Sequence, residues 1–495
     1  MRKLLTIVAA TVVVVVLVAA VAVYLFFSGD GMRSALEQQA STWLGQPVKI
    51  KAARGQLFPR PGIGLSGIEV GEPVQLTLAD VDLSTDLRAL FSRRIEDARI
   101  VVSDSTIQMP LTISLPQESD ASTTGPATSG NGVEIVSIGE ISLRNVSIRS
   151  RGREVKVSAD SSLKGNHLTL RSFTAESGST SLQVDGEADL EPRVDAKLRA
   201  RANKIDLDEL LALADAFSPN RPAGQRQASS SPLTMKLAAQ ISADSATAAG
   251  VQLSKLAATM TMDGDRFALT PLSFGLFGGA YEGALNGRLG ESMSVTLQSR
   301  LKGLDVAQLA MFGGSPDTVT GTLSGEGTFS ANGADMSAAL ANATGKGSAT
   351  IVDGTIKRLD LLRTVVLFFG RPAPDTAAAS DKFERIDTTF SLAKQVFRAD
   401  TFAMRSRDAD ITGSATLALA SQALDGMVDL MLSKELSAQA GTDLARFTRE
   451  NDRIILPANL GGTIGQPRIT INALAAARRG IQNEIQRRFK GLFGR

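Results

Sequence analysis

The chain contains a single histidine, His167, and this limits the chemistry that its side chains can perform. His167 takes a polar position in an alternating segment beside an expected turn, and no G-x-S-x-G, H-E-x-x-H or Walker pattern occurs. These patterns identify many serine hydrolases, zinc proteases and nucleoside triphosphatases. We therefore expect no catalytic residues and no enzymatic activity.

Three neighbouring acids, Asp206, Asp208 and Glu209, are the strongest candidate for a metal site. Their spacing also fits a helix N-cap, because an Asp followed three residues later by an acid or amide can form a capping box. Asp305 and Gln308 repeat this spacing without the additional acids. Capping explains both copies, so we expect helix caps, no metal site and no cofactor.

A glycine-rich segment at 62–67 matches the pattern G-x-G-x-x-G. A dinucleotide site requires a strand before this pattern and a helix after it. Here Pro59-Arg60-Pro61 precedes the glycines and Ile-Glu-Val-Gly-Glu-Pro follows them. The context therefore argues against nucleotide binding.

Strands are the elements that must position any functional side chains. From Val133 onward, apolar residues recur at every second position, with charged or hydroxyl residues between them. This period is typical of sheets with one apolar and one polar face. We predict a mainly β fold: an elongated, twisted antiparallel sheet with short capping helices.

An internal repeat connects these strands to two helices. Residues 197–211 align without gaps on residues 296–310, and each copy predicts a strand that leads into a capped helix. Leu359-Asp360-Leu361 resembles the start of a third copy. Apolar spacing also predicts a helix from Gly31 to Leu44.

An uncharged apolar run near the N-terminus predicts a membrane anchor, with Arg2 and Lys3 preceding it. The predicted anchor residues are Leu4, Val15 and Phe27. The run is long enough to cross a hydrocarbon core of about 30 Å, and the basic residues place the N-terminus in the cytoplasm. The alternative is a cleaved signal peptide with Ala20-Val21-Ala22 before the cleavage site. Apolar residues continue beyond this triad, which favours an uncleaved, single-pass inner-membrane anchor.

Composition excludes two further classes. Basic and acidic residues nearly cancel, 53 against 51, which argues against a nucleic-acid partner. The chain has no cysteine, so it forms neither disulfides nor thiolate metal sites.

Changes in period and composition divide the chain into segments. The predicted segments are the cytoplasmic tip and anchor (1–27), a helix with strands (28–115), a linker (116–132), a first β segment (133–217), a loop (218–232), a second β segment (233–370), a loop (371–382), a C-terminal β segment (383–473) and a basic amphipathic helix (474–495). This last helix carries Leu474, Ile481 and Ile485 on one stripe. It could bind an anionic membrane surface or plug the end of the sheet, and the sequence leaves both open.

The order of these parts resembles the AsmA family of Gram-negative inner-membrane proteins. The resemblance rests on the anchor, on ADVDLSTDLRALFSRRIEDARIVVSDSTIQM (79–109), on Gly345–Leu361, and on Leu460–Ile469 before the basic helix. It implies a periplasmic β-rich body, a chorein-like region over 28–115, and a gutter of strands lined by aliphatic side chains. It also implies a part in outer-membrane biogenesis, and it adds no catalytic residues.

An apolar sheet face must be covered or remain as an oversized exposed patch. If the sheet curls into a groove, phospholipid acyl chains can cover this face. The predicted lining residues are Leu143, Val155, Val157, Leu168, Leu170, Leu182, Val184, Leu198, Leu237, Met260 and Leu297. We expect binding or conduction of acyl chains between the inner and outer membranes, with a partner protein in the periplasm or the outer membrane. The alternative is a membrane-tethered scaffold that assists outer-membrane protein assembly, in which this face is packed core.

Overall fold

The chain is mainly β, with few short helices, as the alternation predicted. The computed structural model describes residues 32–56, 60–86, 94–110, 134–135, 137–217, 235–290, 292–334, 336–356, 382–439, 449–450, 452–479, 481, 482 and 485. The chain divides into two compact units. Unit 1 comprises Met1–Gly250 and Met260–Gly264, and unit 2 comprises Val251–Thr259 and Asp265–Arg495.

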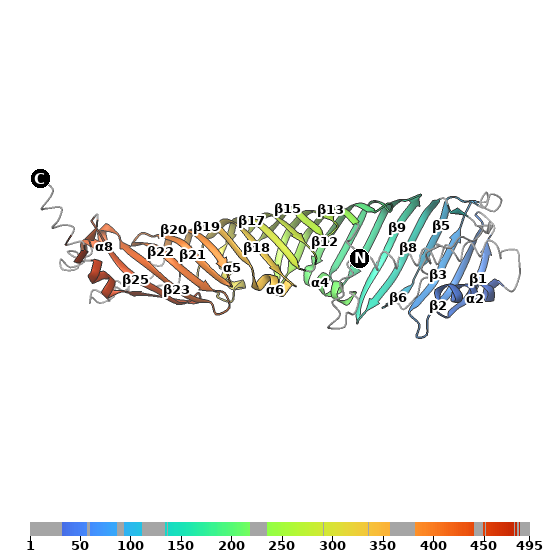
Figure 1. Cartoon of the computed structure of the whole chain (residues 1–495), viewed down its shortest axis with the longest axis horizontal. Helices are drawn as coiled ribbons and strands as arrows, with labels where there is room; N and C mark the ends of the chain where they lie inside the picture. Colours follow the sequence, from blue (N-terminus) through green and yellow to red (C-terminus); the bar gives the residue numbers. More distant parts are fainter. Residues whose placement is uncertain are drawn as a thin grey trace, which may run out of the picture. The chain divides into compact units, whose positions relative to one another are not determined.

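Unit 1 is a twisted sheet with a helix near each end of its sequence (Figure 1). Its elements are α2 (Met32–Leu44), β1 (Val48–Gln56), β2 (Gly62–Val70), β3 (Leu76–Ser84), β4 (Arg94–Ile95), β5 (Ala98–Ser103), β6 (Thr106–Met109), β7 (Glu134–Ile135), β8 (Ser137–Ser150), β9 (Arg153–Lys164), β10 (His167–Ser177), β11 (Thr180–Asp189), β12 (Val194–Asp206), α4 (Leu207–Ala216) and β13 (Met235–Ala248). Strand β14 (Val251–Asp263) has residues in both units.

Helix α2 confirms the predicted helix at Gly31 to Leu44 and packs along β1 (Figure 1). Its spacing places Leu36, Ala40 and Leu44 on one side, and all three are buried. They join the apolar residues of β1 to β8 in the main core of unit 1. Helix α2 therefore covers the apolar face of the first strands of this unit.

Unit 2 is likewise built of twisted β-strands, with three short helices and a helical segment at 473–479. Its elements are β15 (Arg266–Leu276), β16 (Gly279–Arg288), β17 (Met293–Asp305), α5 (Val306–Phe312), β18 (Thr322–Gly333), α6 (Met336–Ala341), β19 (Thr344–Thr355), β20 (Lys382–Ala393), β21 (Val396–Arg405), β22 (Ala409–Ala418), β23 (Ala423–Leu432), α8 (Lys434–Gln439), β24 (Arg449–Glu450), β25 (Arg453–Thr463) and β26 (Gln466–Ile471). Its main core joins β20 to β26.

Most strand pairs are antiparallel, but the prediction of a wholly antiparallel sheet was wrong. Strand β8 pairs in parallel with β5 and β6, and β12 pairs in parallel with β13. The connection between β12 and β13 contains α4 and residues 217–234, which is long enough to return the chain to the starting end of β12. The period of the side chains gives no information on strand direction.

Several predicted segments fall outside the described residues. They are the anchor from Leu4 to Phe27, the linker at 116–132, the loop at 218–232, all but Lys382 of the loop at 371–382, and the third repeat at Leu359. Among the described residues, no helix is long and apolar enough to span a membrane.

The described part of the basic C-terminal segment is helical at 473–479 and exposes its apolar stripe. Leu474, Ile481 and Ile485 are 75%, 59% and 49% exposed. Arg479 donates a 2.8 Å hydrogen bond to the carboxylate of Asp429, which fastens the segment to β23. Ala476 of the same segment is buried, so both interpretations of this segment stay predictions.

Candidate functional site

The predicted lining residues of β8 to β13 share one face of the sheet in unit 1. Residues paired directly across neighbouring strands point to the same side. One such row runs through Leu163, Leu168, Ala188, Ala196 and Leu237. The other predicted residues pair in the same way or lie two positions along a strand: Leu143, Val155, Val157, Leu170, Leu182, Val184 and Leu198. The strands thus assemble the face that the sequence predicted.

The leucines and Val184 on this face of β10 to β12 are only half-buried, in contrast to the side chains under α2, whereas the small Ala188 and Ala196 are buried. Leu65 and Val81, in β2 and β3, are 2% and 1% exposed. Of the predicted lining residues, only Val157 is fully buried, and β10 contains no buried residue along its length. Aliphatic side chains on this face therefore remain accessible to a mobile apolar molecule.

Unit 2 has a comparable face, on which aromatic rings accompany the aliphatic residues. Leu297 pairs with Phe329, which pairs with Gly345, and the row continues through Leu392 to Phe397. A Cβ atom on Gly345 would collide with the ring of Phe329, so the glycine lets that ring lie against the strand. The last predicted residue, Met260, is half-buried in β14.

None of the lining residues predicted from the sequence is a phenylalanine, although three rings lie on this face. The ring of Phe390 lies 6.2 Å from that of Phe329 and 4.6 Å from that of Phe397, centroid to centroid. Phe329 occupies an apolar position in the strict alternation of 322–333, which was the available signal. The apolar face of unit 2 is thus partly aromatic.

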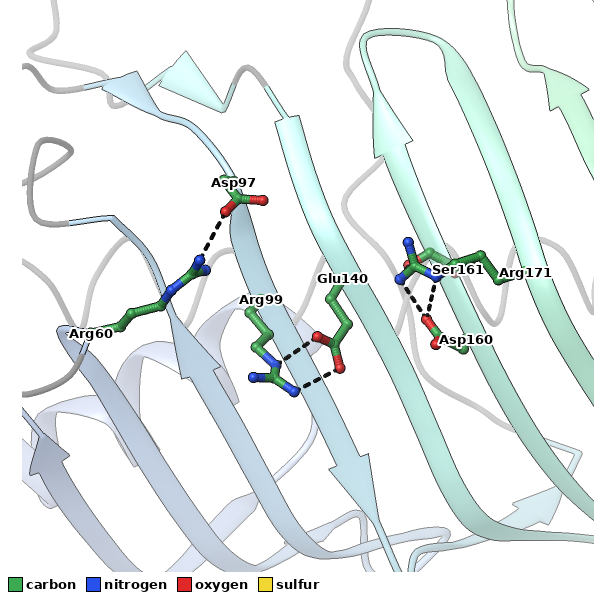
Figure 2. Close-up of polar contacts among 7 residues, drawn as sticks. All are labelled: Arg60, Asp97, Arg99, Glu140, Asp160, Ser161 and Arg171. Atoms are coloured by element: carbon green, nitrogen blue, oxygen red, sulfur yellow. Dashed lines mark hydrogen bonds and ion pairs between the residues drawn. The ribbon is translucent and has the colours of Figure 1, made fainter.

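In unit 1, the face opposite to the apolar face carries ion pairs between neighbouring strands (Figure 2). Arg99 lies 2.8 Å from Glu140, and Arg171 donates hydrogen bonds of 3.0 and 2.6 Å to Asp160. The hydrogen bonds to the Asp160 carboxylate raise the pKa of Arg171 above its ordinary value. Because these groups are exposed, each pair contributes only about 0–1 kcal/mol to stability. Their main effect is to keep this face hydrated.

His167 belongs to the polar face, as its position in the alternation predicted. Its Nδ1 atom lies 2.8 Å from Asp189 Oδ1, and the two side chains are 46% and 64% exposed. The pair joins β10 to β11 in the same manner as the neighbouring ion pairs. The histidine thus has a cross-strand partner within the polar face.

The first of the three acids near residue 206 caps a helix, as the spacing predicted. Asp206 is the N-cap of α4, and its carboxylate accepts a 3.0 Å hydrogen bond from the backbone N–H of Glu209. Asp208 accepts from the backbone N–H of Ala249, and Glu209 accepts from the Ser177 hydroxyl. The reciprocal half of a capping box is absent at this described site, because the N–H of Asp206 donates to a threonine hydroxyl instead.

Asp305 repeats the cap at the start of α5. Its carboxylate accepts hydrogen bonds of 2.8 Å from the backbone N–H of Ala307 and 3.0 Å from Gln308 Nε2. The Gln308 bond and then the Ala307 bond hold the pKa of Asp305 below its ordinary value. Both copies of the internal repeat therefore form the same structure, a strand followed directly by a capped helix.

Substitution of Asp206 by Ala should lower the stability of unit 1 by about 0.5–2 kcal/mol, because a helix N–H loses its acceptor. Asp206→Asn, which retains an acceptor oxygen, should lose much less. Denaturant unfolding measures both, and metal analysis of the purified variants completes the test. Metal bound to the unmodified chain and lost from Asp206→Ala would show that the acids form a metal site.

A family model, described as the AsmA family, matches residues 1–113 and 127–402 of the chain. Comparison with curated proteins gave no match. Comparison with solved structures also gave none. The family match includes all the predicted lining residues and both capped helices.

Proposed function

The chain belongs to the AsmA family, and from this premise we propose that it binds and conducts phospholipid acyl chains along its apolar sheet faces as part of outer-membrane biogenesis. The observation that carries the proposal is the half-buried aliphatic face of β10 to β12. Each methylene group of a lipid that such a face removes from water gains about 0.8 kcal/mol. An acyl chain is thus a suitable cover.

The chemistry of the face suits movement as well as binding. Hydrophobic contact is non-directional, so an acyl chain that shifts along the strands exchanges one aliphatic neighbour for an equivalent one. The ion pairs of the opposite face favour water over hydrocarbon. Lipid is therefore expected on one side of the sheet only.

We further propose that Leu4–Phe27 anchors the protein in the inner membrane and that the body lies in the periplasm. Arg2 and Lys3 before the apolar run support this orientation. A C-terminal reporter should then be active only in the periplasm, on a protein of full-length mass. A shortened product starting near Val23 would instead show a cleaved signal peptide.

Photocrosslinking in growing cells tests lipid binding with the full-length chain. Phe173 lies on the apolar face, where it pairs with Val184, and Thr174 is its neighbour on the polar face. We expect p-benzoylphenylalanine at position 173 to yield phospholipid adducts by mass spectrometry, and the same group at position 174 to yield few. Protein adducts in place of lipid at position 173 would support the scaffold alternative. Equal lipid yields at both positions would contradict a one-sided lipid groove.

A further inference from the structure

An apolar cavity of about 620 Å³ lies within unit 2, between α5 and the strands β21 to β26. Its floor includes Met404, Ile411 and Val428, which are 3%, 2% and 5% exposed. Leu417 and Leu424 pair directly in the row that contains Phe397, so the cavity opens on the apolar face of the sheet. The volume lies in the range of small-molecule sites, about 300–1,000 Å³.

Helix α5 and the loop after it form the roof of this cavity. The carbonyl oxygen of Gly313 accepts a 3.2 Å hydrogen bond from Gln422 Nε2, which fastens the roof to the turn between β22 and β23. On its other side, Val319 forms a bridge with Ile356. Within this loop, the Thr318 hydroxyl donates to the Ser315 carbonyl. Most of the side chains that line the cavity are apolar.

The mouth of the cavity is apolar and exposed. Phe312, Leu419 and Ile464 all line the cavity, and they are 53%, 49% and 39% exposed. Isolated exposed apolar side chains are common, but these three gather at one opening that leads to a buried apolar floor. This arrangement admits a hydrocarbon chain and offers no charged side chain for a headgroup inside.

We propose that this α5-roofed cavity holds the end of one phospholipid acyl chain while the headgroup stays outside the mouth. The inference rests on the proposed function, and it adds a holding site at which a lipid pauses instead of sliding along an open face. A charged or polar ligand would lose its hydration in this cavity without gaining partners. The ligand proposed for this cavity is therefore an acyl chain of a phospholipid.

Three crosslinking positions separate this inference from the proposed function. In each case p-benzoylphenylalanine replaces one residue of the full-length chain in cells. Phe312 lies at the mouth of the cavity, and Phe329 lies on the open apolar face. Met311 is a 66% exposed neighbour of Phe312 that does not line the cavity. We expect phospholipid adducts at Phe312 and Phe329 and few at Met311. Adducts at Phe329 without adducts at Phe312 would overturn the holding site and leave the proposed function standing. Lipid at neither position would overturn both, and free fatty acid alone at Phe312 would overturn the phospholipid assignment.

A second experiment tests the holding site by filling the cavity with a larger side chain. Ala310 lines the cavity from α5, so Ala310→Trp should lower the Phe312 adduct about tenfold, the loss expected when two methylene groups no longer find a buried place. Met311→Trp places the same indole side chain outside the cavity and should change little. If Ala310→Trp fails to fold, Ala310→Leu fills less volume and should cause a smaller loss. Adduct yields unaffected by filling would show that lipid only touches the mouth, and would overturn the proposal.

Discussion

Val184→Asp is expected to abolish phospholipid capture by unit 1 and to leave most of its folded structure intact. Val184 is half-buried on the apolar face, between Phe173 and Ala200 of the neighbouring strands. On an accessible face, water can reach the new carboxylate in the lipid-free protein, so the cost to folding is small. Hydrocarbon that passes the same point must contact an unpaired charge, which is strongly unfavourable.

The matched control is Gln183→Asp on the same strand. Gln183 is exposed on the opposite face, where it pairs with Arg201, so a carboxylate there is compatible with its surroundings. Thermal unfolding, lipid adducts at position 173 and rescue of an envelope defect in cells should be measured for both variants. Collapse of the folded state in Val184→Asp alone would identify the face as packed core. Unchanged lipid and unchanged rescue would remove Val184 from the path of the lipid.

The strands and their apolar faces were predictable because a period of two determines which side chains share a face. Leu168, Leu182 and Leu198 could be assigned to one face before any pairing was known. Register then placed Leu168 and Leu198 in neighbouring rows and Leu182 two rows further along. The caps were predictable for a similar reason. The spacing of Asp206 and Glu209 is a local property, and it survives in the fold.

The features that could not be predicted from the sequence depend on irregular strand pairing or on contacts between distant parts of the chain. A register shift between Leu170 and Phe173 changes the alternation in β10, so simple counting leaves Phe173 off the apolar face. The cavity in unit 2 requires α5 to meet strands about a hundred residues later in the chain, as the Gly313–Gln422 hydrogen bond shows. A one-dimensional pattern contains no signal for such a contact. The parallel pairing of β12 with β13 was missed because the period of the side chains does not depend on strand direction.

Leu65→Ala is expected to destabilise unit 1 far more than Leu170→Ala, although both remove the same atoms from the same sheet. Leu65 is 2% exposed in the core closed by α2, and it pairs with Val81, which is 1% exposed. Truncation there should leave a cavity and cost about 2–5 kcal/mol. Leu170 is half-buried and faces Gly186 and Ser161, so its truncation removes fewer packing contacts.

Pulse proteolysis of the full-length chain across a urea series measures both changes in the same unit. If the apolar face of β10 is a groove wall, the loss for Leu170→Ala should be less than half of the loss for Leu65→Ala. Equal losses would mean that Leu170 packs as tightly as Leu65, and the lipid groove would lose its physical basis in unit 1. Lipid binding provides a further comparison, because under the proposed function an acyl chain contacts Leu170 but not Leu65. Supplying phospholipid should therefore stabilise the unmodified chain more than Leu170→Ala, while Leu65→Ala keeps the full gain.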